Sequence, residues 1–566
     1  MSTAETPTPQ PRVRPLPLSG VLRVNRPSDI WFKPATSVAV AVSLALVPLL
    51  AVGRSELAPY AMAGAFCALY GHQLPYAARA RAGVRVVLGM TAAVGIALTC
   101  ASLIGSVVVL IAVAAVLAAV LKAACDAGRL GPPGHVIPVF VVSGVLFSPQ
   151  EPHQVPAHTA LTLAAGAVGL LVTLAPALLR REGPERRATA RALLAAAAYR
   201  DTRHGTGGDR ATARHAAAAA VHHAWQSLLA AGGRTPARRT LERLVLQAEA
   251  ALADAPGAAD ADRLRAWADQ VRSHRPLPGV PVLPGTGDEL LGIDAERAAR
   301  RERDRRRTAA LLLRPGSPLL PVALRCAVGC AAAGYAGLAL GVGHPYWAIV
   351  SASAIYQANV TLTWHRVLQR TLGNLLGVAV FAAIVPLART SVVVLAALCV
   401  VLSFCNEALV SRNYWLGSVS VTPMALLVTE FGRVRPAAEL VTDRVLDTLA
   451  GVLVGLAAAI LITNRRTGGR VEKALTATEE AASAAEHALA APAEPARLAT
   501  ARRHLTASIV ELRDAADTAA GEWWQRALPE QALVRTEQRA HRTLAATVRR
   551  QGPPRAESPH LEELSA

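Results

Sequence analysis

The sequence predicts an all-α membrane protein made of two parallel six-span transmembrane repeats, with a cytoplasmic helical insert between them and a cytoplasmic helical C-terminal tail. Of the 566 residues, 52% are hydrophobic and only 17% are charged, whereas about a quarter of the residues in a soluble domain are charged. The apolar residues form runs long enough to cross a bilayer. The fold class follows from these runs and from their repetition along the chain.

The apolar stretch at 34–181 recurs at 317–466 with the same spacing of polar and helix-breaking residues. Pro59-Tyr60 corresponds to Pro345-Tyr346 at an offset of 286 residues (345 − 59). Other pairs lie 285 residues apart (366 − 81), namely Arg81 and Arg366, Arg85 and Arg370, Pro138 and Pro423, Gly166 and Gly451, and Arg180 and Arg465. Each half is expected to cross an even number of times, so both halves have the same orientation. Parallel repeats of this kind occur in transporters and enclose a pathway between the two halves.

Six spans are expected in each half, and the second and fifth of each half are the short ones. The expected spans are 35–53, 57–72, 84–103, 105–123, 134–149 and 157–179, then 318–340, 345–360, 369–387, 391–408, 412–429 and 441–463. The short spans have about 16 residues, below the usual ~20. Short or Pro/Gly-interrupted spans at matching positions indicate a binding site. The alternative is that they are tilted or re-entrant packing helices without a ligand.

Positive charges favour one side of the membrane. With a cytoplasmic N-terminus, the inner loops and their flanks hold Arg79, Arg81, Arg85, Lys122, Arg129, Arg366, Arg370 and Arg412, and the outer loops only Arg54, Arg389, Arg433 and Arg435. This bias predicts a multi-pass protein of the cell inner (plasma) membrane with cytoplasmic N- and C-termini. Residues 1–33 are Pro-rich and polar, carry no signal-peptide pattern, and are expected to be disordered.

The polar segments at 182–316 and 467–566 are predicted to be cytoplasmic and helical. Expected helices are 185–200, 211–231, 236–254, 258–273 and 289–312 in the insert, with a Pro-rich connector at 276–284, and 470–491, 495–519 and 521–550 in the tail. Their Ala-rich faces would also suit a homodimer, which the sequence leaves open. The net charge of +19 does not indicate nucleic-acid binding, because acidic residues accompany the basic ones and no aromatic-basic interleaving occurs.

No catalytic or cofactor-binding motif is present. The sequence lacks GxxxxGK[ST], GxSxG, HExxH and any paired Cys/His ligand set. The seven cysteines lie in or beside the apolar runs without a CxxC spacing, and they imply no disulfide framework. We therefore expect no enzymatic activity, no metal and no cofactor.

The informative polar residues lie in the second membrane half. The span that opens with Tyr346-Trp347 ends near Gln357, and Trp364, His365 and Arg366 are expected in the loop that follows. Gly373 and Gly377 form a small-xxx-small pair, which lets helices approach closely. Arg370, one turn earlier, would face the same seam.

These residues resemble the fusaric acid resistance-like (FUSC) family of inner-membrane proteins, the aromatic acid exporters. The family's Tyr-Trp-Ala opening matches Tyr346-Trp347-Ala348, and its Gln near the end of that span matches Gln357. Its Arg-x-x-Gly-Thr-x-x-Gly pattern matches residues 370–377, with Asn374 where Thr is usual. Residues 444–451 resemble the family's final span. Arg325 lies where an Arg often follows the start of the first span. The resemblance reaches the first half only through the duplication. It implies six-span units, polar cytoplasmic segments and secondary export of organic acids.

Ionisable residues within or beside the spans suggest a transport mechanism. They are Arg325, Arg370, Asp443, Arg444 and Asp447. Such groups cost roughly 2.5–3.5 kcal/mol each at a helix centre, so they tend to face a bundle interior or water. We hypothesise that the arginines attract an anionic aromatic acid, while Asp443 or Asp447 couples proton uptake. The aromatic residues Tyr346, Trp347, Tyr414 and Trp415 could stack on a planar acid.

Each of these residues also has a structural interpretation. Arg325 and Arg370 could extend to the membrane interface, Arg444 could pair with Asp447, and Asp443 could be solvated. For Tyr346 and Trp347 an aromatic belt at the membrane surface is favoured over ligand contact.

The sequence thus predicts a secondary transporter that exports small organic or aromatic carboxylic acids, driven by the proton gradient. Its expected partners are the lipid bilayer and a small anionic organic acid. Two alternatives stay open, a non-transporting membrane scaffold whose cytoplasmic helices bind a partner, and a passive anion channel.

Overall fold

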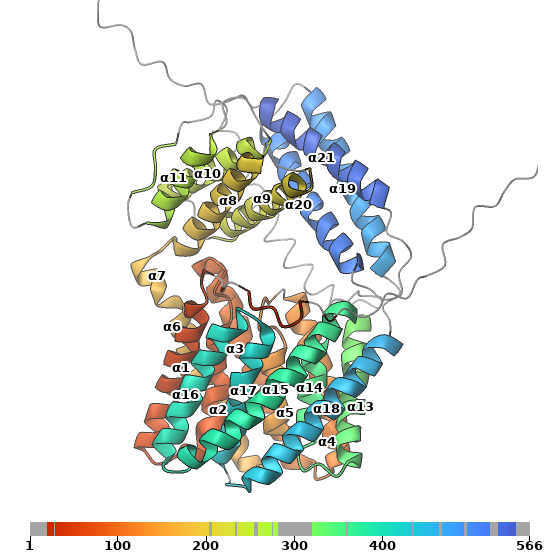
Figure 1. The fold of residues 1–566 in the computed structure, drawn as a ribbon. Helices are drawn as coiled ribbons and strands as arrows, with labels where there is room; N and C mark the ends of the chain where they lie inside the picture. The colour runs from red at the N-terminus through yellow and green to blue at the C-terminus, as the bar shows by residue number, and fades with distance from the viewer. Residues whose placement is uncertain are drawn as a thin grey trace, which may run out of the picture.

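The structure is a computed structural model in which the described parts of the chain are helical, with no strand among them (Figure 1). The described residues are 18, 20–25, 27, 29–128, 130–202, 207–231, 235–253, 259–273, 276–280, 320–357, 360–432, 434–462, 467–491, 495–520 and 530–550. They form a block of apolar helices with two polar helical bundles on one side of it. The chain is a multi-pass membrane protein.

The apolar block contains a helix at each of the twelve expected positions. In the first half these are α1 (Phe32–Ala51), α2 (Ala58–Ala65), α3 (Tyr76–Leu103), α4 (Val107–Ala127), α5 (Val136–Leu146) and α6 (Val155–Leu174). In the second half they are α13 (Leu320–Ala339), α14 (Tyr346–Ile355), α15 (Val360–Ala388), α16 (Val392–Val410), α17 (Tyr414–Glu430) and α18 (Ala437–Leu461).

Eight of these helices are long and apolar enough to cross a membrane. The other four are α2, α5, α14 and α17, with 8, 11, 10 and 17 residues. They are the second and fifth helices of each half, which were expected to be short. Helices α2, α5 and α14 are shorter still than expected: α2 gives way to a 3-10 turn at Phe66–Leu69 and α14 to extended backbone at Tyr356.

The third helix of each half begins earlier than predicted. Helix α3 starts at Tyr76 rather than at 84, and α15 at Val360 rather than at 369. Trp364, His365 and Arg366 therefore lie on α15, and their placement in a loop was wrong. Hydropathy detects only the apolar part of a helix, whereas arginine and alanine continue the helix readily into its polar end.

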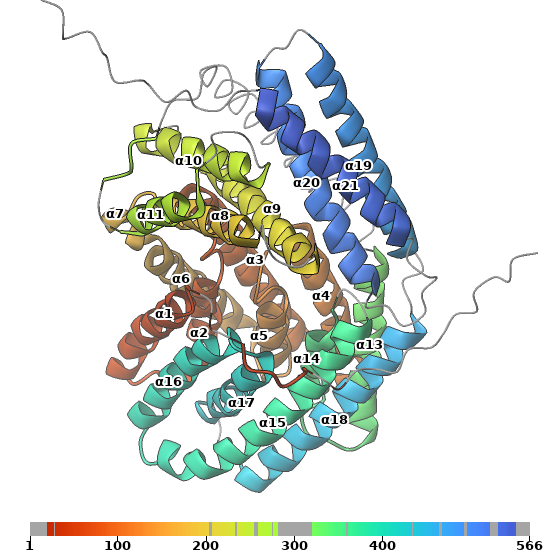
Figure 2. The same ribbon diagram turned by 45° about the horizontal axis from the view of Figure 1, so that its top comes forward.

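Contacts between helices follow one pattern in both halves (Figures 1 and 2). Helices α2 and α3 pack on α6, and α14 and α15 pack on α18; α5 packs on α3, and α17 on α15. Between the halves, α1 packs on α16 and α4 on α13, while α5 contacts α14. One hydrophobic core draws residues from both halves.

The polar segments form two bundles on the same side of the block (Figure 1). A short helix, α7 (Pro176–Leu179), leads to the insert with α8 (Gly183–Asp201), α9 (Gly207–Ala230), α10 (Pro236–Leu252) and α11 (Ala261–Arg272). The tail contains α19 (Thr467–Ala490), α20 (Pro495–Ala520) and α21 (Glu530–Arg550). The expected helix at 289–312, the end of the connector at 281–284 and residues 521–529 lie outside the described residues.

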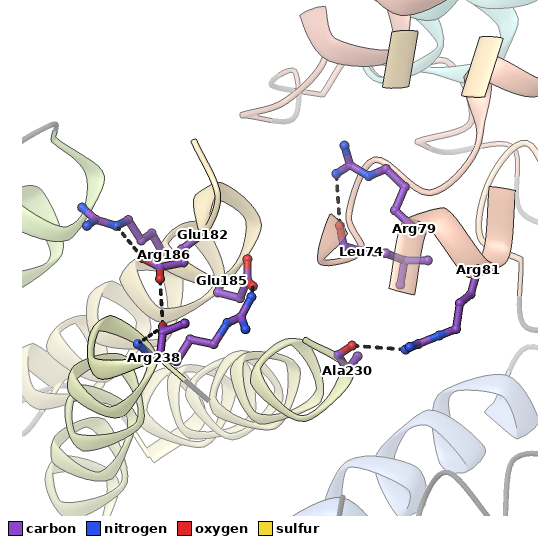
Figure 3. A network of polar contacts seen from close by, with 9 residues as sticks. Leu74, Arg79, Arg81, Glu182, Glu185, Arg186, Ala230 and Arg238 are labelled. Atoms are coloured by element: carbon purple, nitrogen blue, oxygen red, sulfur yellow. Dashed lines mark hydrogen bonds and ion pairs between the residues drawn. The ribbon is translucent and has the colours of Figure 1, made fainter. Parts of the chain in front are cut away.

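The two bundles pack on each other and on the membrane block. Helix α20 contacts α9, α21 contacts α10, and a buried ion pair joins Arg502 Nε to Glu249 Oε2 at 3.0 Å. Figure 3 shows the junction with the block, where Arg81 of α3 donates to the Ala230 carbonyl at 3.5 Å. Within the insert, Arg238 pairs with the buried Glu185 at 3.1 Å.

Residues 20–25, expected to be disordered, contact the loop between α16 and α17. The Asn413 side-chain amide donates to the carbonyls of Val21 and Arg23 at 3.1 and 2.9 Å. The Asn25 amide donates to the Arg412 carbonyl at 3.1 Å. This segment therefore lies on the side of the block that carries the two bundles. We call the opposite side the distal end.

Candidate substrate site

Most of the predicted site residues lie where α14, α15, α17 and α18 of the second half meet. Glycines make the first of two close seams. A Cβ at Gly373 would collide with the Ser418 side chain and come within 2.6 Å of the Trp415 carbonyl oxygen. A Cβ at Gly377 would lie 2.7 Å from Thr422 Cβ. Helices α15 and α17 therefore approach to a distance that only glycine at these positions allows.

Arg370 lies on this seam, one turn before Gly373. Its Nη1 donates to the Tyr414 hydroxyl at 2.9 Å, and the Arg366 guanidinium lies over the Tyr414 ring, 3.8 Å from the ring centroid. Arg370 is only 3% exposed, so its guanidinium is enclosed by the surrounding helices. Its Nε is buried and has no hydrogen-bond partner in the part of the chain that the structure describes.

Asn374 connects the same seam to α18. Its amide nitrogen donates to the Thr448 hydroxyl at 3.0 Å, and it accepts from the Thr422 hydroxyl at 2.5 Å. The Thr448 hydroxyl also donates to the Arg444 carbonyl at 2.7 Å. These bonds tie α15, α17 and α18 into one polar network inside the apolar block.

The second seam joins α14 to α18 at Gly451. A Cβ there would lie 2.5 Å from the Ala348 carbonyl oxygen and 2.7 Å from Ser351 Cβ. This approach brings Trp347, at the start of α14, against Arg444. The Arg444 guanidinium carbon lies over the Trp347 ring at 4.1 Å from the centroid, a cation–π distance.

Arg444 and Asp447 are buried without the polar partners that such groups normally have. Arg444 is 2% and Asp447 0% exposed. Nε and Nη1 of Arg444 and both carboxylate oxygens of Asp447 lack hydrogen-bond partners within the described part of the chain. The two side chains, three residues apart, do not form an ion pair there, so the pairing offered as an alternative is not seen. Buried charges ordinarily carry partners, and the two together leave hydrogen-bonding capacity for a ligand.

Tyr346 and Trp347 are buried rather than exposed to lipid, so the favoured aromatic-belt interpretation was wrong. They stack against aromatic side chains of the first half. Phe140 lies 5.8 Å from Trp347 and Phe147 lies 5.6 Å from Tyr346, measured between ring centroids. Phe140 and Phe147 could not be predicted as part of the site, because apolar residues of a span carry no signal that distinguishes a site from a core.

A second polar cluster lies at the distal end, one turn from Asp447. His344 Nδ1 lies 2.9 Å from Asp443 Oδ2, and Arg435 donates to His344 Nε2. Next to it, Arg389 forms a two-bond ion pair with Glu430 at 2.9 and 3.1 Å. Asp443 is thus hydrogen-bonded as well as partly exposed. The sequence predicts Arg435 and Arg389 only as charges of the outer loops, because it does not show that the loops carrying His344, Arg389 and Arg435 meet.

Two predicted residues stand apart from the network. Gln357 follows α14, where its backbone amide donates to the Thr363 hydroxyl at 3.2 Å and its side chain to the Tyr356 carbonyl. Arg325 is buried on α13, which packs against α14 and α18. Among the described residues, no group of three or more His, Cys, Asp or Glu could hold a metal.

Comparison with known proteins places this region in a family. A 225-residue stretch is 30% identical to the uncharacterized membrane protein YvaC of Bacillus subtilis (strain 168). The aligned stretch covers 37% of this chain and 32% of YvaC. The chain therefore matches about a third of the length of this curated relative. No solved structure matches. Residues 331–458, which include the end of α13, all of α14 to α17 and most of α18, match the fusaric acid resistance protein-like family.

Proposed function

We propose that this chain is a secondary transporter that exports small organic or aromatic carboxylic acids through the plasma membrane, coupled to proton movement. In this proposal the chain crosses the membrane twelve times as two parallel six-span repeats. The N-terminus, the insert and the tail are cytoplasmic, and the distal end faces outward.

The matched contacts support the repeat. Within each half, the second and third helices pack on the sixth, and the fifth packs on the third. Between halves, the first helix of each packs on the fourth helix of the other, as α1 does on α16 and α13 on α4. Such reciprocal contacts are expected when two similar units are related by an approximate twofold axis. The shared end for the insert and the tail (Figure 1) supports a parallel arrangement.

The observation that carries the proposal is the buried Arg444 guanidinium, whose Nε and Nη1 have no hydrogen-bond partner among the described residues. An arginine inside a membrane bundle is costly and is typically kept for function. Its guanidinium matches a carboxylate in two-bond geometry, and Nε and Nη1 are free to donate. Trp347 is the second residue of α14, so the guanidinium also adjoins a helix N-terminal turn, where negative charge is favoured.

The neighbouring residues suit a planar acid. Trp347, Tyr346 and Phe140 supply aromatic faces within one cluster, and stacking on a ring would favour aromatic over aliphatic acids. Arg370 with Tyr414 lies nearer the cytoplasmic end of the same helices and would receive the anion first. Asp447, three residues after Arg444, is the group assigned to proton coupling.

The test uses purified protein in liposomes, with uptake measured for benzoate, other aromatic carboxylates and hexanoate. Hydrogen bonds to charged groups contribute about 1.5–3 kcal/mol each, so Arg444→Met should weaken binding by at least about tenfold. Arg370→Ala should also weaken transport. The matched control is Arg85→Ala, the first-half counterpart of Arg370 (370 − 85 = 285), which is exposed on α3.

Three results would contradict the proposal. Unaltered transport by Arg444→Met would remove the assigned role of this residue. Transport that persists unchanged when a protonophore collapses the gradient would favour a passive anion channel. No transport of any acid in the panel would favour the scaffold.

A further inference from the structure

The distal cluster has a defined proton arrangement. A guanidinium only donates hydrogen bonds, so His344 Nε2, which receives the bond from Arg435, carries a lone pair. The His344 proton is then on Nδ1 and is donated to Asp443 Oδ2 at 2.9 Å. His344 is therefore a neutral imidazole that connects Arg435 to a carboxylate.

The cluster leads toward the buried Asp447. Asp443 and Asp447 are four residues apart on α18, so they share one helix face. The Asp443 side chain is 20% exposed, whereas Asp447 is fully buried. Glycines at the end of α13 leave room for both carboxylates, since a Cβ at Gly343 would lie 2.9 Å from Asp443 Oδ2 and one at Gly337 would lie 3.1 Å from Asp447 Oδ1.

The first half has an uncharged cluster at the matching place. Gln150 and His158 lie 285 residues before Arg435 and Asp443 (435 − 150 and 443 − 158). His158 bonds to the Gln150 side chain at 2.9 Å and stacks on Tyr60 with the ring centroids 4.1 Å apart. Thr162 occupies the position of Asp447 and donates to a backbone carbonyl. Carboxylates at these positions thus occur only in the half that holds Arg444.

We propose that His344 and Asp443 form the site at which protons from the outer water reach Asp447, with Arg435 covering His344 until it moves. This inference rests on the proposed transport function. When Arg435 leaves Nε2, that nitrogen accepts a proton from a hydronium ion of the outer water, which becomes neutral water. The imidazolium then passes its Nδ1 proton to Asp443, one helical turn from Asp447. His344 is again a neutral imidazole, now with its proton on Nε2, and it regains the Nδ1 proton by exchange with water before Arg435 covers Nε2 again. One proton enters and one is handed on, so the charge balances.

The carboxylates near His344 favour this role, whereas burial and the Arg435 guanidinium lower the pKa of His344 while Arg435 covers it. Asp443 of α18 accepts its proton, and Arg435 precedes that helix. Glu439, on the first turn of α18, adds a second negative charge near the imidazole. Arg389 donates to the Arg435 carbonyl and so fixes the backbone from which the covering side chain extends. The Tyr346 ring of α14 packs edge-on, 5.8 Å away.

The experiment compares two assays on the same liposomes. Exchange of labelled for unlabelled benzoate without a pH gradient reports substrate binding and movement, and accumulation driven by an imposed pH gradient reports proton coupling. His344→Gln should keep exchange and lower driven accumulation by at least about tenfold, as expected when a proton-transfer group is removed. The matched control His158→Gln should keep both activities.

Driven accumulation by His344→Gln equal to that of the parent would overturn this inference and leave the proposed function intact. If the unmodified protein does not exchange benzoate, the proposed function is overturned, and this inference with it. A second variant, Arg435→Gln, covers the case in which His344→Gln does not fold. Removing the cover should let driven accumulation reach half its maximum at a higher external pH, and an unchanged pH profile would also overturn the inference.

Discussion

The seam between α14 and α18 allows a quantitative test of how packing positions the site. Gly451→Ala adds one Cβ, which would lie 2.5 Å from the Ala348 carbonyl oxygen. Ordinary van der Waals contact begins at 3.4 Å, so α14 must shift by about 0.9 Å (3.4 − 2.5) unless α18 moves instead. The obstructing atom is backbone, which cannot rotate away as a flexible side chain can.

Gly166→Ala is the matched control, because Gly166 precedes Gly451 by 285 residues and lies on α6. Its Cβ would meet Val87 Cγ1 at 3.0 Å, a shortfall of about 0.4 Å (3.4 − 3.0) against the end of a side chain. Both substitutions gain the same ~1 kcal/mol of helix propensity from glycine to alanine. The difference between the two variants therefore isolates the clash.

We expect Gly451→Ala to be less stable than Gly166→Ala by about 1–3 kcal/mol, the usual effect of overpacking a core. Displacement of α14 also moves Trp347 relative to Arg444, which now lie 4.1 Å apart. A misplacement near 1 Å can cost on the order of a hundredfold in rate, so benzoate exchange should fall by at least about tenfold in Gly451→Ala alone.

Thermal unfolding in detergent and benzoate exchange in liposomes measure the two effects. Equal melting temperatures and equal exchange rates for the two variants would refute the argument that this seam positions Trp347. A stable Gly451→Ala with impaired exchange would instead show that α14 shifts without loss of packing.

Two further predictions concern the polar bundles. Glu249→Gln should destabilise the contact between insert and tail by about 3–5 kcal/mol, because Arg502 loses a buried counter-charge. Hydrogen exchange in α10 and α20 should become faster. The exposed pair Glu486–Arg539 should contribute under about 1 kcal/mol by the same measurement. Burial lowers the pKa of His541 to about 4, so the unfolded chain binds more protons between pH 6.5 and 4. The tail should lose up to about 3 kcal/mol of stability as the pH falls through this window, and His541→Leu should remove that part of the pH dependence.

The positions of the membrane helices could be predicted from the sequence, and their ends and partners could not. Hydropathy and the repeat located all twelve apolar segments, because a helix in lipid must be apolar along most of its length. The same measure missed the polar start of α15 at 360–368, where residues outside the lipid continue the helix. It also could not show that α1 packs on α16, since apolar faces in a bundle do not specify their partner.

Several residues of the candidate site could be found from the sequence because polar residues inside a span are unusual. Arg370, Arg444 and Asp447 were identified in this way, and the structure buries all three. Phe140 could not be found, because phenylalanine is ordinary in a span and its role depends on facing Trp347 across the two halves. His344 was visible in the sequence, but the role proposed for it requires the meeting of two loops far apart along the chain.

The short helices explain why this chemistry lies where it does. A ten-residue helix such as α14 is about 15 Å long, while the hydrocarbon core of a bilayer is about 30 Å thick. At least one end of α14 must therefore lie at the depth of the hydrocarbon, where its unsatisfied backbone groups need partners from the protein or a ligand. Its N-terminal end adjoins Arg444 through Trp347, so two features that favour negative charge meet there. The pairing of a helix N-terminus, which favours negative charge, with the buried Arg444 guanidinium supports the proposal of a carboxylate site at this end of α14.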